Sequence, residues 1–514
     1  MTMTPGGDAL TLSLVSIPGE AAVRYPQRIA IVDREREYTY ADIWREILIR
    51  ARALRDELGV EPGSHVALMA PNGLNFVAEY YAILACGGVV VPMAPMLVTD
   101  EVEAQLRDSD ARSIIVEQDF AQIALPAAER VGIRTRVIEP DFVAGSSGEA
   151  ELDAPVSRHP LDPAVLFYTS GTTGRPKGAV LTHLNLVMNC FTNAFLANSL
   201  GTEDVVLGCL PLFHTYGQTV AMSSSFLSRS KLVLQRRFDA AEAIDLMRRH
   251  GVNVFIGVPT MYIALLEAIG DQPPVQLRMC ISGGAPLPVA VLERFEQRFG
   301  CPVQEGYGLS ETSPSATVNH TELGIRAGTI GQPLWGIEVE IARADLEDRV
   351  ELLGPGELGE IVIRGHSVFT GYYRQPEATA AAIVDGWFRT GDLGIKDEDG
   401  FRSVVDRKKD MIIRGGYNVY PREVEEVVAR HPAVAAVGVV GVPDDKLGEE
   451  VLAAVVLDAR APSTTPEELS EWMQDRIAHH KRPRIIRIVD ELPLGPSRKI
   501  LKREIRALYQ EGRL

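Results

Sequence analysis

The segment 168–178 of the sequence, YTSGTTGRPKG, combines residue types that bind phosphate. It follows the apolar run 164–167 and precedes the apolar residues 179–181. Glycines let backbone N–H groups approach an anion closely, hydroxyl groups add hydrogen-bond donors, and a lysine adds a positive charge. The segment therefore predicts a loop that cradles a polyphosphate, formed by Thr169, Ser170, Gly171, Thr172, Thr173, Gly174 and Lys177.

The pattern of this loop differs from the Walker A sequence, which requires G-x-x-x-x-G-K-[ST]. Lys177 stands three residues after Gly174 and is followed by Gly178. A glycine- and threonine-rich hairpin turn is the alternative interpretation. Three glycines, four Ser/Thr hydroxyls and one lysine within eleven residues favour a phosphate site over a plain turn, but they do not identify the reaction.

Four segments farther along the chain, together with this loop, resemble the motifs of the adenylate-forming superfamily in the family's order. They are EGYGLSET (305–312), TGDLG (390–394), DRKKD (406–410) and PSRKI (496–500). The superfamily includes acyl-CoA synthetases, coumarate–CoA ligase, firefly luciferase and the adenylation domains of peptide synthetases. Because the segments extend over nearly the whole chain, the resemblance covers more than one local element.

The resemblance implies a set of nucleotide contacts. Tyr307 would stack on adenine, although a core aromatic is the alternative. Asp392 would accept hydrogen bonds from the ribose hydroxyls, and Arg407 would reach the ribose or the α-phosphate, with a salt-bridged turn as the alternative for both. The glycine-rich turn 282–286 and the segment 305–312 would supply the remaining contacts, at Gly283, Gly284, Ala285, Glu305, Gly306, Gly308 and Ser310.

Lys499 is the residue expected to promote adenylation. A carboxylate and ATP are both anions, so an ammonium between them offsets their repulsion and stabilises the charge that develops during transfer. Glu311 resembles the family's Mg²⁺ ligand, and Mg²⁺ would neutralise the polyphosphate. His214, in PLFHTYG (211–217), resembles the residue that closes one side of the carboxylate pocket, with a structural histidine as the alternative.

Arg498 departs from the family pattern, which usually has glycine immediately before this lysine. A residue other than glycine rarely adopts φ > 0. Either the backbone at Arg498 has an ordinary negative φ, or the loop that carries Lys499 lies differently from the loop of the family. Arg498 is also the only feature that favours the non-enzyme alternative, a nucleotide-binding protein that has lost catalysis.

Short β-branched runs alternate with helical patterns through most of the chain. Strands at 65–69 and 88–91 flank a helix at 74–86, and strands at 252–256 and 277–281 flank a helix at 260–269. This alternation predicts an α/β fold with doubly covered, mainly parallel sheets in a large N-terminal domain.

The pattern changes after the glycine- and charge-rich stretch 391–416. We predict an N-terminal domain of residues 1–408, which binds ATP and the acid, and a small mobile α+β domain of residues 409–514, which carries the lysine. Lys409 resembles the family's hinge position, and Gly415 and Gly416 resemble the wall of its pantetheine tunnel. The resemblance implies that rotation about the hinge exchanges the lysine for this wall.

Composition limits the class of protein. The chain has 514 residues, 46% of them hydrophobic, and a net charge of −17, which disfavours nucleic-acid binding. The charge is uneven, because residues 407–514 hold 19 basic and 17 acidic side chains. This relatively basic last fifth either meets an anionic ligand or is an ordinary solvated surface.

Five cysteines without a C-x-x-C pair argue against a disulfide framework and a zinc site, and they suit a reducing cytoplasm. The N-terminus lacks a signal-peptide pattern. The longest apolar run, 84–98, contains glycine and proline and is shorter than the ~20 residues of a membrane span. We expect a cytoplasmic protein without a transmembrane segment; peripheral membrane association and oligomeric state, including a homodimer, are left open.

The resemblance implies an AMP-forming acid–thiol ligase that uses ATP, Mg²⁺ and coenzyme A on a small-molecule carboxylic acid. The segments 252–259 and 280–285, which resemble the acyl pocket, offer no anchor for an α-amino group. EGYGLSETSP most resembles fatty-acyl ligases, which favours a medium- or long-chain fatty acid over a bulky aromatic or polycyclic acid. Few residues follow Ile505, so we expect no fused carrier domain; CoA is the simpler acceptor and a separate carrier protein the alternative.

Overall fold

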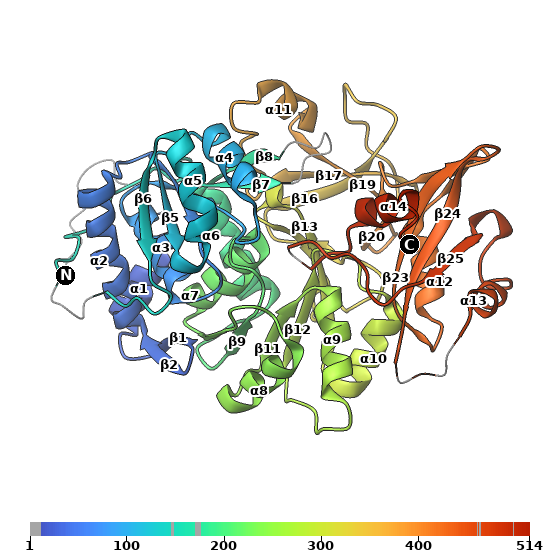
Figure 1. Cartoon of the computed structure of the whole chain (residues 1–514), viewed down its shortest axis with the longest axis horizontal. Coiled ribbons are helices and arrows are strands. Elements are labelled where there is room, and N and C mark those ends of the chain that lie inside the picture. The colour runs from blue at the N-terminus through green and yellow to red at the C-terminus, as the bar shows by residue number, and fades with distance from the viewer. Residues whose placement is uncertain (1–11, 145–148, 170–175, 460, 462–463, 497) are drawn as a thin grey trace.

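The computed structural model describes residues 12–144, 149–169, 176–459, 461, 464–496 and 498–514. They form two large sheets rich in parallel strands, a smaller antiparallel sheet, and a C-terminal module at the right of Figure 1. The centre of the expected phosphate loop lies outside the described residues. This applies to Ser170, Gly171, Thr172, Thr173 and Gly174.

The first large sheet has six strands, which are parallel except for the last strand, β8, which pairs antiparallel with β7. In order across the sheet they are β6 (Arg134–Ile138), β5 (Ser113–Glu117), β3 (His65–Met69), β4 (Val89–Pro92), β7 (Pro163–Thr169) and β8 (Lys177–Thr182). The connecting helices are α3 (Leu74–Ala85), α4 (Thr99–Asp108) and, after η1 (Gln118–Phe120), α5 (Ala121–Val131). The predicted strand–helix–strand unit at 65–91 is confirmed to within one residue at each boundary.

The second large sheet has nine strands, and its six central strands are parallel. In order they are β15 (Gln332–Pro333), β14 (Ser315–Val318), β13 (Val303–Gly308), β12 (Met279–Gly283), β11 (Val254–Gly257), β9 (Val205–Gly208), β10 (Lys231–Leu234), β1 (Ile29–Asp33) and β2 (Arg36–Thr39). Its helices include α8 (Ala240–His250), α9 (Pro259–Ile269) and α10 (Val289–Phe299). The predicted α/β fold with mainly parallel sheets is therefore confirmed.

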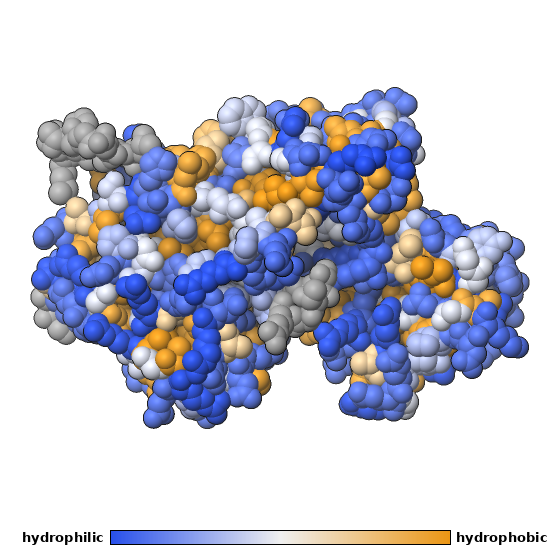
Figure 2. Space-filling view, turned by 90° about the horizontal axis from the view of Figure 1, so that it is seen from above, coloured by the Kyte–Doolittle hydropathy of each residue, from blue (hydrophilic) through white to orange (hydrophobic). Residues whose placement is uncertain are grey.

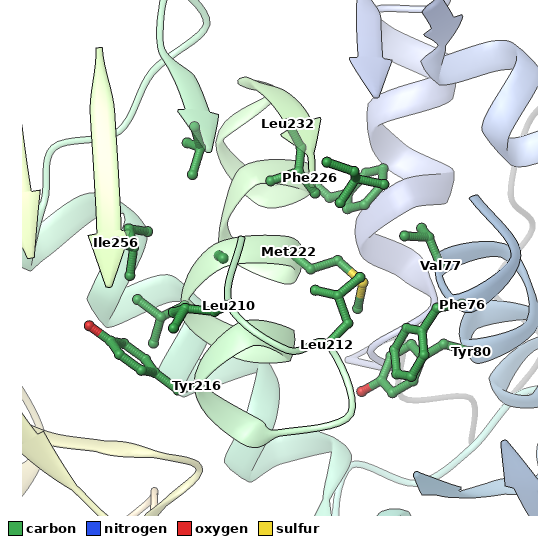
Figure 3. Packing of buried hydrophobic residues seen from close by; sticks show 14 of the residues in the cluster. Phe76, Val77, Tyr80, Leu210, Leu212, Tyr216, Met222, Phe226, Leu232 and Ile256 are labelled. Atoms are coloured by element: carbon green, nitrogen blue, oxygen red, sulfur yellow. The ribbon is translucent and has the colours of Figure 1, made fainter. Parts of the chain in front are cut away.

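The two large sheets share one apolar core. All twelve residues of α3 are buried; most are apolar, and the two polar ones, Asn75 and Glu79, both accept hydrogen bonds from Arg50. In Figure 3, Met222 lies among Leu212 and Phe226, with Phe76 and Tyr80 of α3 opposite. This core joins the two sheets through α1 (Ser16–Arg24), α2 (Tyr40–Leu58), α6 (His183–Phe191), η2 (Thr192–Ala197), η3 (Tyr216–Ser223) and α7 (Ser224–Ser228).

A third sheet, which the sequence pattern did not predict, is antiparallel. Its strands are β16 (Ile337–Ala342), β17 (Gly359–Gly365), β18 (Ile383–Val384), β19 (Trp387–Lys396) and β20 (Arg402–Arg407), with α11 (Pro376–Ala382) before β18. The register of β19 and β20 places Asp392 opposite Arg407. These two residues are therefore brought together by strand pairing alone.

The C-terminal module has its own sheet and its own apolar clusters, as expected for an α+β unit. Its strands are β21 (Ile412–Arg414), β22 (Tyr417–Val419), β23 (Val434–Asp444), β24 (Gly448–Leu457) and β25 (Ile485–Ile488). Its helices are α12 (Pro421–Ala429), α13 (Pro466–Trp472), η5 (His479–Lys481) and α14 (Lys502–Gln510). The helix α13 begins with Pro466 at its first position, after the Thr465 cap. The chain changes sheet between Arg407 and Ile412, where the domain boundary is predicted.

The surface seen from above is mostly hydrophilic, with smaller hydrophobic patches between the polar residues (Figure 2). Across the part of the chain that the structure describes, no helix has the length and apolar character needed to cross a bilayer. All five cysteines are free and buried, which agrees with the absence of a disulfide framework.

Candidate active site

A cavity of about 1110 Å³ lies where the carboxyl ends of β12 and β13 meet the third sheet and the C-terminal module. Its volume exceeds the roughly 300–1,000 Å³ of a site for one drug-sized ligand. The walls include most of the described residues that the sequence singles out. These are Thr169, Lys177, His214, Gly283, Gly284, Gly306, Tyr307, Gly308, Ser310, Glu311, Asp392, Arg407, Lys409 and Lys499.

Among the expected site residues that the structure describes, four do not line the cavity: Ala285, Glu305, Gly415 and Gly416. The Glu305 carboxylate instead accepts a hydrogen bond from the Leu287 N–H at 3.3 Å, and burial raises its pKa to about 7. Gly415 and Gly416 form the turn between β21 and β22, on the C-terminal module. The structure therefore gives no support for a nucleotide contact by the Glu305 side chain.

Glu311 lies in η4 (Ser310–Thr312), and its side chain is held by a residue from a distant segment. The Tyr372 hydroxyl donates a hydrogen bond to Glu311 Oε1 at 2.9 Å, and the Phe369 N–H donates to the Glu311 carbonyl at 2.8 Å. The Lys177 ammonium lies 5.0 Å from the centre of the Tyr372 ring. Burial raises the pKa of Glu311, while Tyr372, Arg407 and Lys177 act in the opposite direction.

The donor set at Glu311 fits a phosphate-bound Mg²⁺ better than a metal held by protein alone. Among the described residues, no group of three or more His, Cys, Asp or Glu side chains could hold a metal ion. Mg²⁺ commonly takes one or two carboxylates and completes its coordination with substrate phosphates and water. A single carboxylate near Lys177 provides that arrangement.

A second group of polar residues surrounds Asp392. The Tyr307 hydroxyl donates to Asp392 Oδ2 at 2.6 Å, and Arg407 Nε lies 3.3 Å from Oδ1. Burial raises the pKa of Asp392, and Arg407 and the Tyr307 hydrogen bond oppose that rise. The group places a carboxylate that can accept hydrogen bonds from a diol beside an aromatic face and a guanidinium.

Lys499 reaches the cavity on a short hairpin, of which the structure describes residues 494–496 and 498–500. Leu494 pairs with Ile500, Gly495 N–H donates to the Lys499 carbonyl at 2.8 Å, and Arg498 N–H donates to the Gly495 carbonyl at 2.8 Å. Arg498 has φ = 59°. The arginine therefore adopts the left-handed conformation, which costs roughly 1–2 kcal/mol for a residue with a Cβ atom.

The Lys499 side chain packs against Gly284. A Cβ atom at Gly284, where φ is 79°, would lie 3.2 Å from Lys499 Cε, so both the backbone conformation and the close approach favour glycine. The pKa of Lys499 is lowered to about 8, mainly by burial and secondly by the nearby Arg407, although Asp392 and Glu311 favour the charged form. Lys499 therefore loses its proton more readily than an exposed lysine.

His214 presents a neutral imidazole. Burial and the neighbouring Lys499 lower the pKa of His214 to about 3. Its Nδ1 accepts a hydrogen bond from the Tyr216 N–H at 3.3 Å, which leaves Nε2 as the protonated nitrogen of the neutral ring. His214 can therefore donate a hydrogen bond without adding a charge.

The cavity continues past His214 towards η2 and η3. The Tyr216 hydroxyl donates to the Ile281 carbonyl at 3.4 Å, and a Cβ atom at Gly283 would lie 3.0 Å from that hydroxyl. Apolar and polar side chains share this part of the wall: Asn193, Asn198, Phe213, Val220, Ile281, Thr317 and Val318.

Sequence reasoning missed several of these wall residues. Tyr372 stands 61 residues after Glu311, and no spacing pattern connects the two. Tyr216 lies within the PLFHTYG segment that drew attention to His214, so its position offered a signal. Asn198 offered none, because a lone asparagine in sequence is most often at the surface.

Comparisons with known proteins agree with this geometry. The family described as "AMP-binding enzyme" matches residues 19–373, and the "AMP-binding enzyme C-terminal domain" matches residues 423–499. A long-chain-fatty-acid–CoA ligase of Bacillus subtilis is 36% identical, over 96% of this chain and 94% of the relative. A feruloyl-CoA synthase of an Amycolatopsis species is also 36% identical, over 96% and 99%.

Among solved structures, ATP-bound MatB from Rhodopseudomonas palustris is 30% identical and has a TM-score of 0.90, over 98% of this chain and 100% of that chain. The apo form of the same protein has a TM-score of 0.80. The arrangement seen here is therefore more similar to the ATP-bound form. The chain belongs to the AMP-binding enzyme family, as an acyl-CoA synthetase of the adenylate-forming superfamily.

Proposed function

We propose that the protein activates a hydrophobic carboxylic acid with ATP to acyl-AMP and pyrophosphate, and then transfers the acyl group to coenzyme A. A medium- or long-chain fatty acid is the first candidate. The observation that carries this proposal is the Lys499 ammonium, which shares one cavity with Glu311 and the Tyr307–Asp392 pair. The similarity to the long-chain-fatty-acid–CoA ligase of Bacillus subtilis supports the fatty acid.

In the first step, Tyr307 and Asp392 hold the adenosine and Lys177 contacts the phosphates. Glu311 binds Mg²⁺, which neutralises charge on the polyphosphate when bound. His214 donates a hydrogen bond from Nε2 to the acid and keeps it directed at the α-phosphate. Lys499 offsets the repulsion between the two anions and stabilises the charge that develops during transfer.

In the second step, residues 409–514 move as a unit about Lys409 relative to residues 1–408. Lys499 then leaves the cavity, and the turn with Gly415 and Gly416 enters to guide the CoA thiol. Two features support this step. Lys409 lies in the described turn between β20 and β21, and the glycine turn is outside the cavity while Lys499 is inside it.

An acid that carries a polar group is the second candidate. Asn198 is one of the residues that line the cavity, and its buried Oδ1 has no hydrogen-bond partner among the described residues. A buried acceptor without a partner is costly, and a substrate hydroxyl that donates a hydrogen bond would relieve that cost. The similarity to the feruloyl-CoA synthase of an Amycolatopsis species supports this second candidate.

A panel of acids assayed for pyrophosphate release separates these candidates. If the pocket accepts fatty acids, kcat/KM should rise with the length of the alkyl acid. If Asn198 binds a polar group of the substrate, hydroxylated aryl acids should have the highest kcat/KM. Asn198→Leu is the matched variant: it should lower activity on hydroxylated aryl acids and leave alkyl acids unaffected.

The most active acid of the panel serves to test two further points, namely which thiol accepts the acyl group and whether the protein catalyses the reaction at all. CoA should support thioester formation, and a holo-carrier protein in place of CoA should not. Failure of ATP–pyrophosphate exchange with every acid would reject the proposed reaction and favour a nucleotide-binding protein without catalysis.

A further inference from the structure

Arg498 connects the lysine hairpin to the N-terminal part of the chain. The Thr260 hydroxyl, at the start of α9, donates a hydrogen bond to the Arg498 carbonyl at 2.9 Å. Arg498 Nη2 donates to the Phe238 carbonyl at 2.8 Å, and its guanidinium lies 5.2 Å from the centre of the Phe238 ring. Three contacts of one residue therefore cross from the C-terminal module to the segment 238–260.

The partners of Arg498 belong to the N-terminal part of the chain and cannot follow the hairpin if it moves. Phe238 is buried in the shared core, and Thr260 is in the first turn of α9. In contrast, the Lys502 ion pair with Glu425, at 2.9 Å, lies within the C-terminal module and would survive such a movement. No ion pair of the described residues includes Arg498, so its guanidinium relies on the carbonyl and the ring.

The backbone of Arg498 adds to this dependence. Its φ of 59° is a conformation that residues other than glycine keep only where surrounding contacts determine it. Lys499 follows directly, so the contacts that hold Arg498 also determine where the lysine begins. The direction of the guanidinium, towards Phe238, separates its role from that of the Lys499 ammonium beside Gly284.

We infer that Arg498 is a positioning residue, a clasp that holds the lysine hairpin against Thr260 and Phe238, and so sets the fraction of time that Lys499 occupies the cavity. This inference rests on the proposed two-step reaction. Adenylation needs the docked hairpin, so its rate scales with the docked fraction. Thioester formation needs the hairpin to leave, so a weaker clasp does not slow it.

The variant Arg498→Met tests the clasp while it keeps a long side chain at the same strained backbone position. Acyl-AMP formation should fall about tenfold, because a charge-assisted hydrogen bond and a ring contact are lost. Conversion of supplied acyl-AMP and CoA to thioester should be unchanged or faster. Arg498→Lys should recover part of the loss, and Thr260→Val, which removes only the other hydrogen bond, should cost roughly threefold.

Arg487→Met is the matched control. Arg487 is an exposed arginine of the same module whose guanidinium contacts only the neighbouring Ile486 carbonyl among the described residues. Both half-reactions should stay normal in this variant. Equal losses in the two half-reactions of Arg498→Met, or no loss in either, would overturn the inference.

A distance measurement tests the clasp without any acid. Cysteines introduced at the exposed positions Glu322 and Asp445 carry a donor and an acceptor dye, because the five native cysteines are buried. With ATP present, Arg498→Met should shift the energy transfer away from the wild-type value, and Arg487→Met should not. An unshifted signal would reject the clasp. A shifted signal with no acid turned over would reject the proposed reaction and keep the clasp.

Discussion

The two halves of the cavity are held in place by different means. The half that contains Glu311 and Asp392 is fixed by Tyr372, Tyr307 and Arg407, all of them within the first 407 residues. The half that contains Lys499 depends on a hairpin from a module with its own sheet. The first half is thus built into the fold, and the second is contributed across an interface.

Because they are held differently, the two halves of the cavity suit different parts of the reaction. A group that must bind the same substrate in both steps gains from fixed neighbours, because no reorganisation is needed when charge develops. A group needed in one step only is more useful on an element that can leave. Substitutions in the first half should therefore affect nucleotide binding or adenylation, and substitutions at the interface should separate the two half-reactions.

The largest effect is expected for Lys499→Ala. Loss of a well-placed charge donor typically costs ~3 kcal/mol, so acyl-AMP formation should fall roughly a hundredfold or more. Thioester formation from supplied acyl-AMP and CoA should persist, because that step no longer uses the ammonium. Separate assays of the two half-reactions measure this. If Lys499→Ala adenylates at a near-normal rate, and only the double variant with Arg498→Gly is inactive, then Arg498 rather than Lys499 stabilises the charge during transfer.

Glu311→Gln should come next, with a loss of roughly tenfold to a hundredfold in adenylation. The amide keeps the shape but binds Mg²⁺ weakly, so the Mg²⁺ concentration for half-maximal rate should rise. A Mg²⁺ titration of pyrophosphate release measures both quantities. Tyr372→Phe is the graded control: it removes only the hydrogen bond to Glu311 and should cost a few-fold. Normal turnover of Glu311→Gln at low Mg²⁺ would contradict the assignment.

Lys409→Pro should act mainly on the second half-reaction, by about tenfold. Proline fixes φ near −65° and stiffens the turn between β20 and β21, yet the docked hairpin is untouched. Acyl-AMP formation should therefore be close to normal while thioester formation falls. Lys408→Ala is a suitable neighbouring control. Equal losses in the two steps would remove the support for a hinge at this turn.

Adenylation should decline with alkaline pH. Burial lowers the pKa of Lys499 to about 8, so the ammonium is present below that pH and is lost as pH rises through it. The kcat/KM for ATP, which reports the free enzyme, should drop about tenfold per pH unit well above 8. Lys499→Arg, if active, should lack this decline. Titration of His214 should not change the rate above about pH 4, because the pKa of His214 is about 3.

The smallest effect is expected for Tyr307→Phe. The ring remains, but the 2.6 Å hydrogen bond to Asp392 is lost. The KM for ATP should rise roughly threefold with little change in kcat, because the bond aligns a binding carboxylate rather than the reacting atoms. Steady-state kinetics at varied ATP concentration measure the split. A large drop in kcat would place Tyr307 closer to the chemistry than proposed.

Local patterns in the sequence predicted the strands and helices whose side chains repeat with a regular period. Runs of β-branched residues and helical periodicity located β3, α3 and β4 to within a residue, because side-chain direction repeats over a strand or a helical turn. The antiparallel third sheet escaped prediction. Its strands carry glycine turns and charged residues, and their pairing depends on neighbours rather than on their own periodicity.

By itself, the sequence determined which residue types were available: a lysine after a glycine-rich loop, a lone glutamate, and a lysine near the C-terminus preceded by arginine. Only the tertiary structure decided which of them meet. Tyr372 reaches Glu311 across 61 residues, and Arg498 reaches Phe238 across 260. Periodicity acts over a few residues, whereas such contacts arise when separate elements bury their apolar faces and bring distant side chains to one cavity.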